Sequence, residues 1–66
     1  MRIDPKKLRF LMMENCMTTD ALAKAAGIGT ATVNTLLHHE RRANPATIGK
    51  VAKALNVNPA ELIKEE

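Results

Sequence analysis

The sequence is poor in aromatic residues, in cysteine and in long apolar runs. It holds one phenylalanine and neither tryptophan nor tyrosine, so its core must be built from aliphatic side chains. The single cysteine, Cys16, excludes an internal disulfide bond and suits a reducing cytoplasm. No run reaches the ~20 apolar residues of a membrane span, and the N-terminus lacks the apolar segment of a signal peptide. We therefore expect a cytoplasmic protein with no membrane partner.

The 66 residues are enough for a single domain, residues 1–66, with a small core. A chain of this length buries only about 60% of its unfolded surface, which leaves no room for an enclosed active site. His38 and His39 have no further Cys or His at metal-ligand spacing, and Cys16 has no nearby base, so an inert, partly buried thiol is expected there. The sequence therefore predicts no metal, no cofactor and no enzymatic activity.

The charge balance is mildly basic, with ten Lys and Arg against seven Asp and Glu and a net charge of +3. Such an excess permits nucleic-acid binding but does not establish it, since many solvated surfaces carry the same imbalance.

An Asp or Asn followed by proline precedes three segments of helical apolar periodicity. These pairs are Asp4-Pro5, Asn44-Pro45 and Asn58-Pro59. The first residue of each pair can accept from exposed N–H groups, and proline suits the first helical position. They predict helices over residues 5–15, over 45–55 and from 59 onward, the last with a capping box between Asn58 and Glu61. The fold class is therefore predicted to be all-α.

Residues 18–39 have the pattern of two short helices joined by a glycine-containing turn. Thr18 or Thr19 can cap the first helix, and the second spans residues 30–38. Gly27 suits a positive φ, and Ile28 is expected to be a buried plug between the helices. The apolar positions of the pair are Leu22, Ala23, Ala26, Val33, Leu36 and Leu37. This pattern is typical of a helix-turn-helix, whose second helix enters the major groove.

The segment LAKAAGIGTATVNTLL resembles the helix-turn-helix of the phage lambda repressor and Cro (Xre) family. The later segment PATIGKVAKALNVNPAEL resembles the fourth and fifth helices of that family, so the resemblance covers about residues 18–63. It implies a compact five-helix, lambda-repressor-like domain that binds double-stranded DNA sequence-specifically. It further implies a transcription regulator, a repressor of phage or mobile-element type, that binds a palindromic operator as a homodimer.

The outward face of helix 30–38 is polar and uncharged. If the apolar positions of this helix face inward, Asn34 and His38 face outward with two threonines and an alanine. Asn can bond bidentately to adenine, while Ala and the Thr methyl can contact a thymine methyl. The resemblance assigns base reading to Thr30, Ala31, Asn34 and Thr35. The simpler interpretation is that these are ordinary solvent-facing residues.

Helix 30–38 has no arginine or lysine, so phosphate contacts must come from its ends. The N–H groups of Gly29 and Thr30 open the helix, and Arg41 and Arg42 follow it. The resemblance adds Thr19, at a position where the family usually has a longer glutamine. The complete predicted DNA-binding set is Thr19, Gly29, Thr30, Ala31, Asn34, Thr35, His38, Arg41 and Arg42.

The sequence departs from the family pattern in two respects. Met12 and Leu37 stand where many members pair an arginine with a glutamate, and an apolar pair can replace a buried ion pair with little loss of stability. His39 stands where the family usually has a glycine that ends the helix.

The first helix also carries a second apolar stripe that contains Phe10, Met13 and Met17. Phe10 either packs under the C-terminal helix in a small core or, with Met13, forms a dimer or partner surface.

The sequence leaves three alternatives to this function. An antitoxin that regulates its own operon usually carries a toxin-binding segment, and none remains outside the five expected helices. A helical adaptor without DNA binding is a second alternative. The hinge-bearing class headed by the lac repressor is disfavoured, because a helix precedes the motif here.

Overall fold

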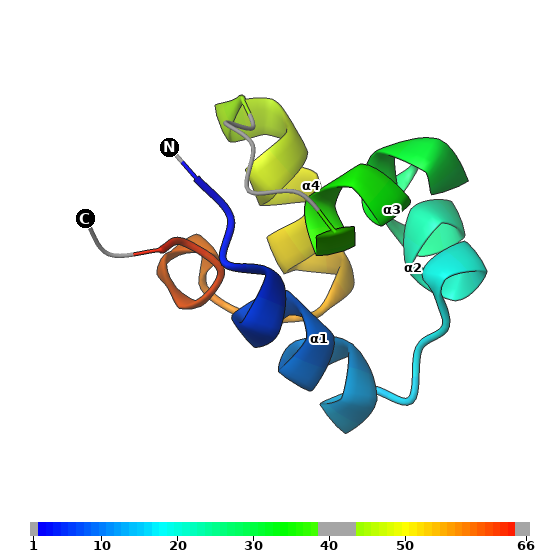
Figure 1. Ribbon diagram of the computed structural model, residues 1–66, viewed down its shortest axis with the longest axis horizontal. Helices are drawn as coiled ribbons and strands as arrows, with labels where there is room; N and C mark the ends of the chain where they lie inside the picture. Colours follow the sequence, from blue (N-terminus) through cyan, green and yellow to red (C-terminus); the bar gives the residue numbers. More distant parts are fainter. Residues whose placement is uncertain (1, 39–43, 65–66) are drawn as a thin grey trace.

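The computed structural model describes residues 2–38 and 44–64, and these form helices around one core. The elements are α1 (Pro5–Glu14), α2 (Thr19–Ala26), α3 (Thr30–His38), α4 (Pro45–Ala54) and the 3-10 turn η1 (Pro59–Glu61) (Figure 1). The all-α prediction is confirmed, and the helix starts agree with the expected ones. The expectation of five α-helices is wrong, since there are four and a single 3-10 turn among the described residues.

The expected fifth helix stops after one turn because its backbone pairs with the N-terminal segment. The Asn58–Glu61 capping box is present. Beyond it, however, the Leu62 carbonyl accepts from the N–H of Asp4 at 2.8 Å, and the Lys64 N–H donates to the carbonyl of Arg2 at 2.9 Å. Figure 1 shows the two ends of the chain on the same side of the molecule. The backbone at Lys64 is therefore held by the N-terminal segment.

Side-chain caps begin the helices as the sequence predicts. The Asp4 carboxylate accepts from the Lys6 N–H at 2.9 Å, and the Asn44 amide oxygen accepts from the Thr47 N–H at 2.8 Å. The hydroxyl of Thr18, rather than that of Thr19, caps α2. Each bond satisfies one of the N–H groups that a helix start leaves without an intrahelical partner.

Three helices end with the same backbone motif. Cys16, Gly27 and Asn56 have left-handed φ values of 53°, 70° and 57°. The next residue then donates its N–H to the carbonyl five positions back, as in a Schellman motif. These bonds are Met17 to Met12 at 2.9 Å, Ile28 to Ala23 at 3.0 Å and Val57 to Ala52 at 3.0 Å.

The apolar residue that follows each left-handed residue is only partly buried and packs against the edge of the core. Ile28 is therefore half-buried and packs against the core, where the sequence predicts a buried plug. Cys16 is exposed, contrary to the expectation of a partly buried thiol, because it occupies the outermost position of the motif that ends α1.

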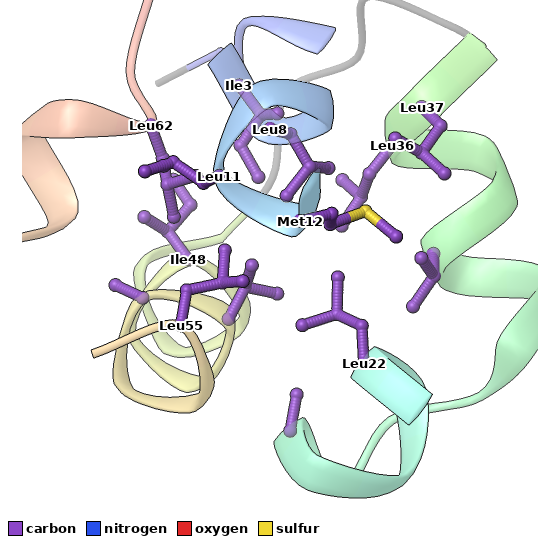
Figure 2. Packing of buried hydrophobic residues seen from close by; sticks show 14 of the residues in the cluster. Ile3, Leu8, Leu11, Met12, Leu22, Leu36, Leu37, Ile48, Leu55 and Leu62 are labelled. Atoms are coloured by element: carbon purple, nitrogen blue, oxygen red, sulfur yellow. The ribbon is translucent and has the colours of Figure 1, made fainter. Parts of the chain in front are cut away.

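Fifteen aliphatic side chains form the core, and no polar side chain is buried among the described residues. All the apolar positions predicted for the helix-turn-helix are buried. Met12 lies between Leu8 and Leu36 in Figure 2, and Leu37 is also buried. The two positions that depart from the family's charged pair therefore both belong to the apolar core.

The two residues of the second stripe that lie on α1 are exposed, whereas Met17, which follows the helix, is half-buried. Phe10 and Met13 are 61% and 63% exposed, so the prediction that Phe10 packs under a C-terminal helix is wrong. The single turn η1 is too short to cover it, since Leu62 turns inward directly afterwards. Within residues 2–38 and 44–64 no helix is long and apolar enough to cross a membrane.

Candidate nucleic-acid interface

The α2–α3 pair is a helix-turn-helix whose geometry depends on Gly27. This residue ends α2 with φ 70°, and a Cβ added there would meet no atom within 4 Å. Glycine is therefore favoured by its backbone conformation and not by lack of space. Gly29 then begins α3 by accepting from the N–H groups of Thr32 and Val33, at 3.0 and 3.2 Å.

The outward face of α3 has the composition that the sequence predicts. Its buried side is held against the core by Val33, Leu36 and Leu37. Four of the predicted base-reading or flanking residues are exposed and Thr35 is half-buried. The exposed four are Thr30, Ala31, Asn34 and His38. The outward face of the helix therefore carries no Asp, Glu, Lys or Arg, and it ends at His38 in the last turn.

Two hydroxyl groups on this face donate hydrogen bonds within the protein. The Thr30 Oγ1 donates to Asp20 Oδ1 at 3.3 Å, and the Thr35 Oγ1 donates to the Ala31 carbonyl at 2.9 Å. A hydroxyl has one donor and two acceptor lone pairs, so both oxygens can still accept. The Asn34 amide, which is exposed, can both donate and accept.

The predicted phosphate anchors are only partly within the described residues. Gly29 is exposed and carries no side-chain oxygen to cover the N–H groups of Thr30 and Ala31, whereas Thr19 is half-buried. Arg41 and Arg42 lie outside the described residues, as does His39.

Charge within the helix-turn-helix is close to balanced. The charged side chains of α2 are Asp20 in its first turn and Lys24 in its last. Any net positive charge for binding an anion must therefore come from residues outside these two helices.

Arg9 holds α1 to the end of α3. Its Nη2 donates to the Leu37 carbonyl at 2.9 Å, across 28 residues of sequence. Carbonyls in the last turn of a helix have no intrahelical partner, and a cation there also interacts favourably with the helix dipole. Arg9 therefore fixes the C-terminal end of α3 from outside the core.

Sequence reasoning did not identify Asp20 or Arg9. An acidic residue in the first turn of a helix stabilises that helix, and this role alone accounts for Asp20 in the sequence. Its contact with Thr30 becomes evident only when α2 and α3 are packed together. Arg9 lies among other basic residues of α1, and only the packing of α1 on α3 brings it to Leu37. Thr32 is also exposed on α3 and was not predicted.

The described residues contain no group of three His, Cys, Asp or Glu side chains that could hold a metal ion. Three hollows on the surface of the described residues are lined by α1, α4, η1 and the segments that flank them, and none of the three is lined by α3.

The chain is similar to several solved structures. A point variant of hydroxyethylphosphonate dioxygenase shares 34% sequence identity with a TM-score of 0.87, and 2-hydroxyethylphosphonate dioxygenase shares 33% with a TM-score of 0.89. The matches cover 98% and 96% of this chain but only 14% and 15% of the dioxygenases. This chain therefore spans about a seventh of their length.

A restriction-modification controller protein has nearly the same extent as this chain. The controller C.AhdI from Aeromonas hydrophila is 27% identical, with a TM-score of 0.82 and 89% coverage of both chains. No curated protein matches the sequence. Residues 7–66 match the Cro/C1-type HTH DNA-binding domain. This match takes in most of α1, the helix-turn-helix and all that follows, and the chain belongs to the Cro/C1-type helix-turn-helix DNA-binding family.

Proposed function

We propose that this chain binds double-stranded DNA sequence-specifically, with α3 in the major groove. The observation that carries the proposal is the exposed polar face of α3, held on a helix-turn-helix frame in a chain of this family. An α-helix fits the major groove, where each base pair presents a distinct pattern of donors and acceptors.

The internal hydrogen bonds of α3 suggest which base edges it reads. The hydroxyls of Thr30 and Thr35 already donate within the protein, so each is free to accept from an adenine N6 or a cytosine N4 amino group. The Asn34 amide can bond bidentately to adenine N6 and N7. Ala31 can contact a thymine methyl. We therefore expect adenine within each half-site.

Phosphate contacts are assigned to the two ends of α3. The N–H groups at Gly29 and Thr30 are candidates at its start, with Thr19, and the candidates at the other end are His38 in the last turn and Arg41 and Arg42 later in the sequence. If two or three of these groups contact phosphates in each chain, the electrostatic contribution is modest. A homodimer on a palindromic operator, with half-sites about one helical turn apart, would double every contact.

We further propose that the chain acts as a transcription regulator, a repressor of the phage or mobile-element type. The similarity to a restriction-modification controller over 89% of both chains supports a regulatory role for this domain. The dioxygenase similarity supports no catalytic role, because it is confined to about a seventh of those enzymes. An antitoxin that regulates its own operon is the alternative.

Selection of bound duplexes from a random pool tests this proposal directly. We expect a palindromic consensus with adenine in each half-site, whereas enrichment of no sequence would refute sequence-specific binding. Asn34→Ala should then lose about 1–3 kcal/mol of discrimination at one base position. Thr32→Ala is the matched control, because Thr32 lies roughly 160° around α3 from Asn34. Equal effects of these two variants would refute the assigned reading face.

A second variant separates base reading from phosphate anchoring. Arg42→Ala should weaken binding to all sequences alike and reduce the slope of log affinity against log salt by about one. Lys50→Ala, an exposed lysine on α4, is its control and should leave the slope unchanged. A change in base preference with Arg42→Ala would contradict the assignment.

A further inference from the structure

The exposed face of α1 carries two large apolar side chains. Phe10 and Met13 are the large hydrophobic side chains that remain exposed, at 61% and 63%, and they lie three residues apart on the same side of α1. Adjacent to them is a hollow of about 410 Å³ lined by Lys7, Phe10, Leu11, Ala60 and Glu61. Large exposed apolar side chains that gather on one face often mark an interaction site.

A positive and a negative side chain flank Phe10 at equal distances along α1. Lys6 lies four residues before Phe10 and Glu14 four residues after it, so all three share one face of α1. At 1.5 Å per residue, the two charges are roughly 6 Å along the helix on either side of Phe10. Both are exposed.

We propose that this face, formed by Lys6, Phe10, Met13 and Glu14, binds a second copy of the chain through antiparallel pairing of the two α1 helices. This inference rests on the proposed function, which calls for a dimer, and identifies the surface that forms it.

The charge pattern selects a second copy over another partner. A two-fold axis requires that if residue i contacts residue j, then j contacts i. An axis beside Phe10 places each Lys6 against the partner's Glu14 and stacks the two Phe10 rings near the centre. Antiparallel pairing also brings opposite ends of the two helix dipoles together. The interface therefore has an aromatic centre and a charged rim, as stable interfaces do.

This dimer leaves the DNA-binding face open. The residues of α1 that contact the core are Leu8, Leu11 and Met12, and α3 packs against that side of the helix. Phe10 and Met13 are on the exposed side, so pairing there covers neither the outward face of α3 nor the start of α2.

Sedimentation velocity over a range of concentrations, without DNA, tests the interface. We expect the unmodified chain to dimerise and Phe10→Ser to raise the dissociation constant at least 100-fold, since a central aromatic residue carries much of an interface's affinity. Lys6→Glu and Glu14→Lys should each raise it about 10-fold, because two attractive pairs become repulsive. Lys50→Glu is the control and should leave the dissociation constant unchanged.

Mixing the two charge variants is the decisive measurement. The Lys6→Glu chain is acidic at both positions of the pair, and the Glu14→Lys chain is basic at both. In an equimolar mixture, each contact of the mixed dimer therefore joins opposite charges again, and the dimer should recover. Both substitutions also suit the helix dipole of α1, so unfolding does not account for lost association. No recovery in the mixture, or a chain that is monomeric at all concentrations, would overturn the proposal.

Binding to a single half-site duplex separates this proposal from the proposed function. Phe10→Ser should retain half-site binding while losing cooperativity on the palindrome. A chain that dimerises through this face but binds no duplex would refute the DNA-binding proposal and leave the interface standing. If Phe10→Ser binds the palindrome as tightly as the unmodified chain, the assigned interface is wrong.

Discussion

Replacing Cys16 with glycine should stabilise the protein. Cys16 adopts φ 53° at the end of α1, in the same backbone motif that Gly27 completes at the end of α2. The left-handed conformation costs a non-glycine residue roughly 1–2 kcal/mol. The greater freedom of glycine in the unfolded chain offsets about 0.4–1 kcal/mol of this gain. Because the thiol is exposed and loses no core packing, we expect a net gain of about 0.5–1 kcal/mol in the free energy of unfolding.

Two companion substitutions test the reason for this gain. Gly27→Ala places a side chain on a left-handed residue and should lower the free energy of unfolding by about 1 kcal/mol. Because the added Cβ would meet no atom within 4 Å, this loss comes from the backbone conformation and not from a steric clash. Asn56→Gly should change the free energy of unfolding little, because Asn tolerates the left-handed region better than other residues do.

Thermal and urea denaturation followed by circular dichroism measures all three variants. At about 4–8 °C per kcal/mol for a domain of this size, Cys16→Gly should raise the Tm by about 2–8 °C. Gly27→Ala should lower it by a similar amount. A lower Tm for Cys16→Gly together with an unchanged Tm for Gly27→Ala would refute the conformational explanation.

Two further predictions concern the groups that hold α3. Arg9→Met should destabilise the fold by about 1 kcal/mol and weaken DNA binding. Arg9→Lys should weaken binding less, because lysine keeps a donor for the Leu37 carbonyl. Equal losses of affinity for the two variants in a titration would show that the bond does not position α3. Asp20→Asn should strengthen DNA binding several-fold at low salt by removing a negative charge beside the start of α3, while retaining an oxygen that accepts from Thr30. Its Tm should fall slightly, and unchanged affinity at low salt would place Asp20 away from the DNA.

Local rules were sufficient to predict where the helices begin and which side of each is buried. The caps at Asp4, Thr18 and Asn44 depend on residues two or three positions apart, and the positive φ of Gly27 depends on one residue. Such short-range effects can be read from a single sequence. For the same reason, the exposed face of α3 agrees with the one expected from its apolar spacing.

Contacts between distant segments determined what the sequence could not predict. The Asn58–Glu61 capping box is a local signal for a helix, and the box does form. Its extension was decided by the pairing of Leu62 and Lys64 with residues near the N-terminus, about 60 positions away. A local helix signal therefore predicted the start of η1 but not its length, and the exposure of Phe10 followed from that shorter element.

The contact between α1 and α3 combines a buried apolar pair with a hydrogen bond from an arginine outside the core. Met12 and Leu37 occupy the positions where the family often pairs an arginine with a glutamate, and here both are buried without a charge to desolvate. Apolar contacts hold two helices together, but because they have no direction they do not fix the position of a helix end. The Arg9 guanidinium, one helical turn before Met12, supplies a directional bond to the Leu37 backbone. The acceptor of this bond is a backbone carbonyl, so the bond depends on where α3 lies and not on any side chain of α3. Substitutions on the outward face of α3 should therefore leave the bond intact.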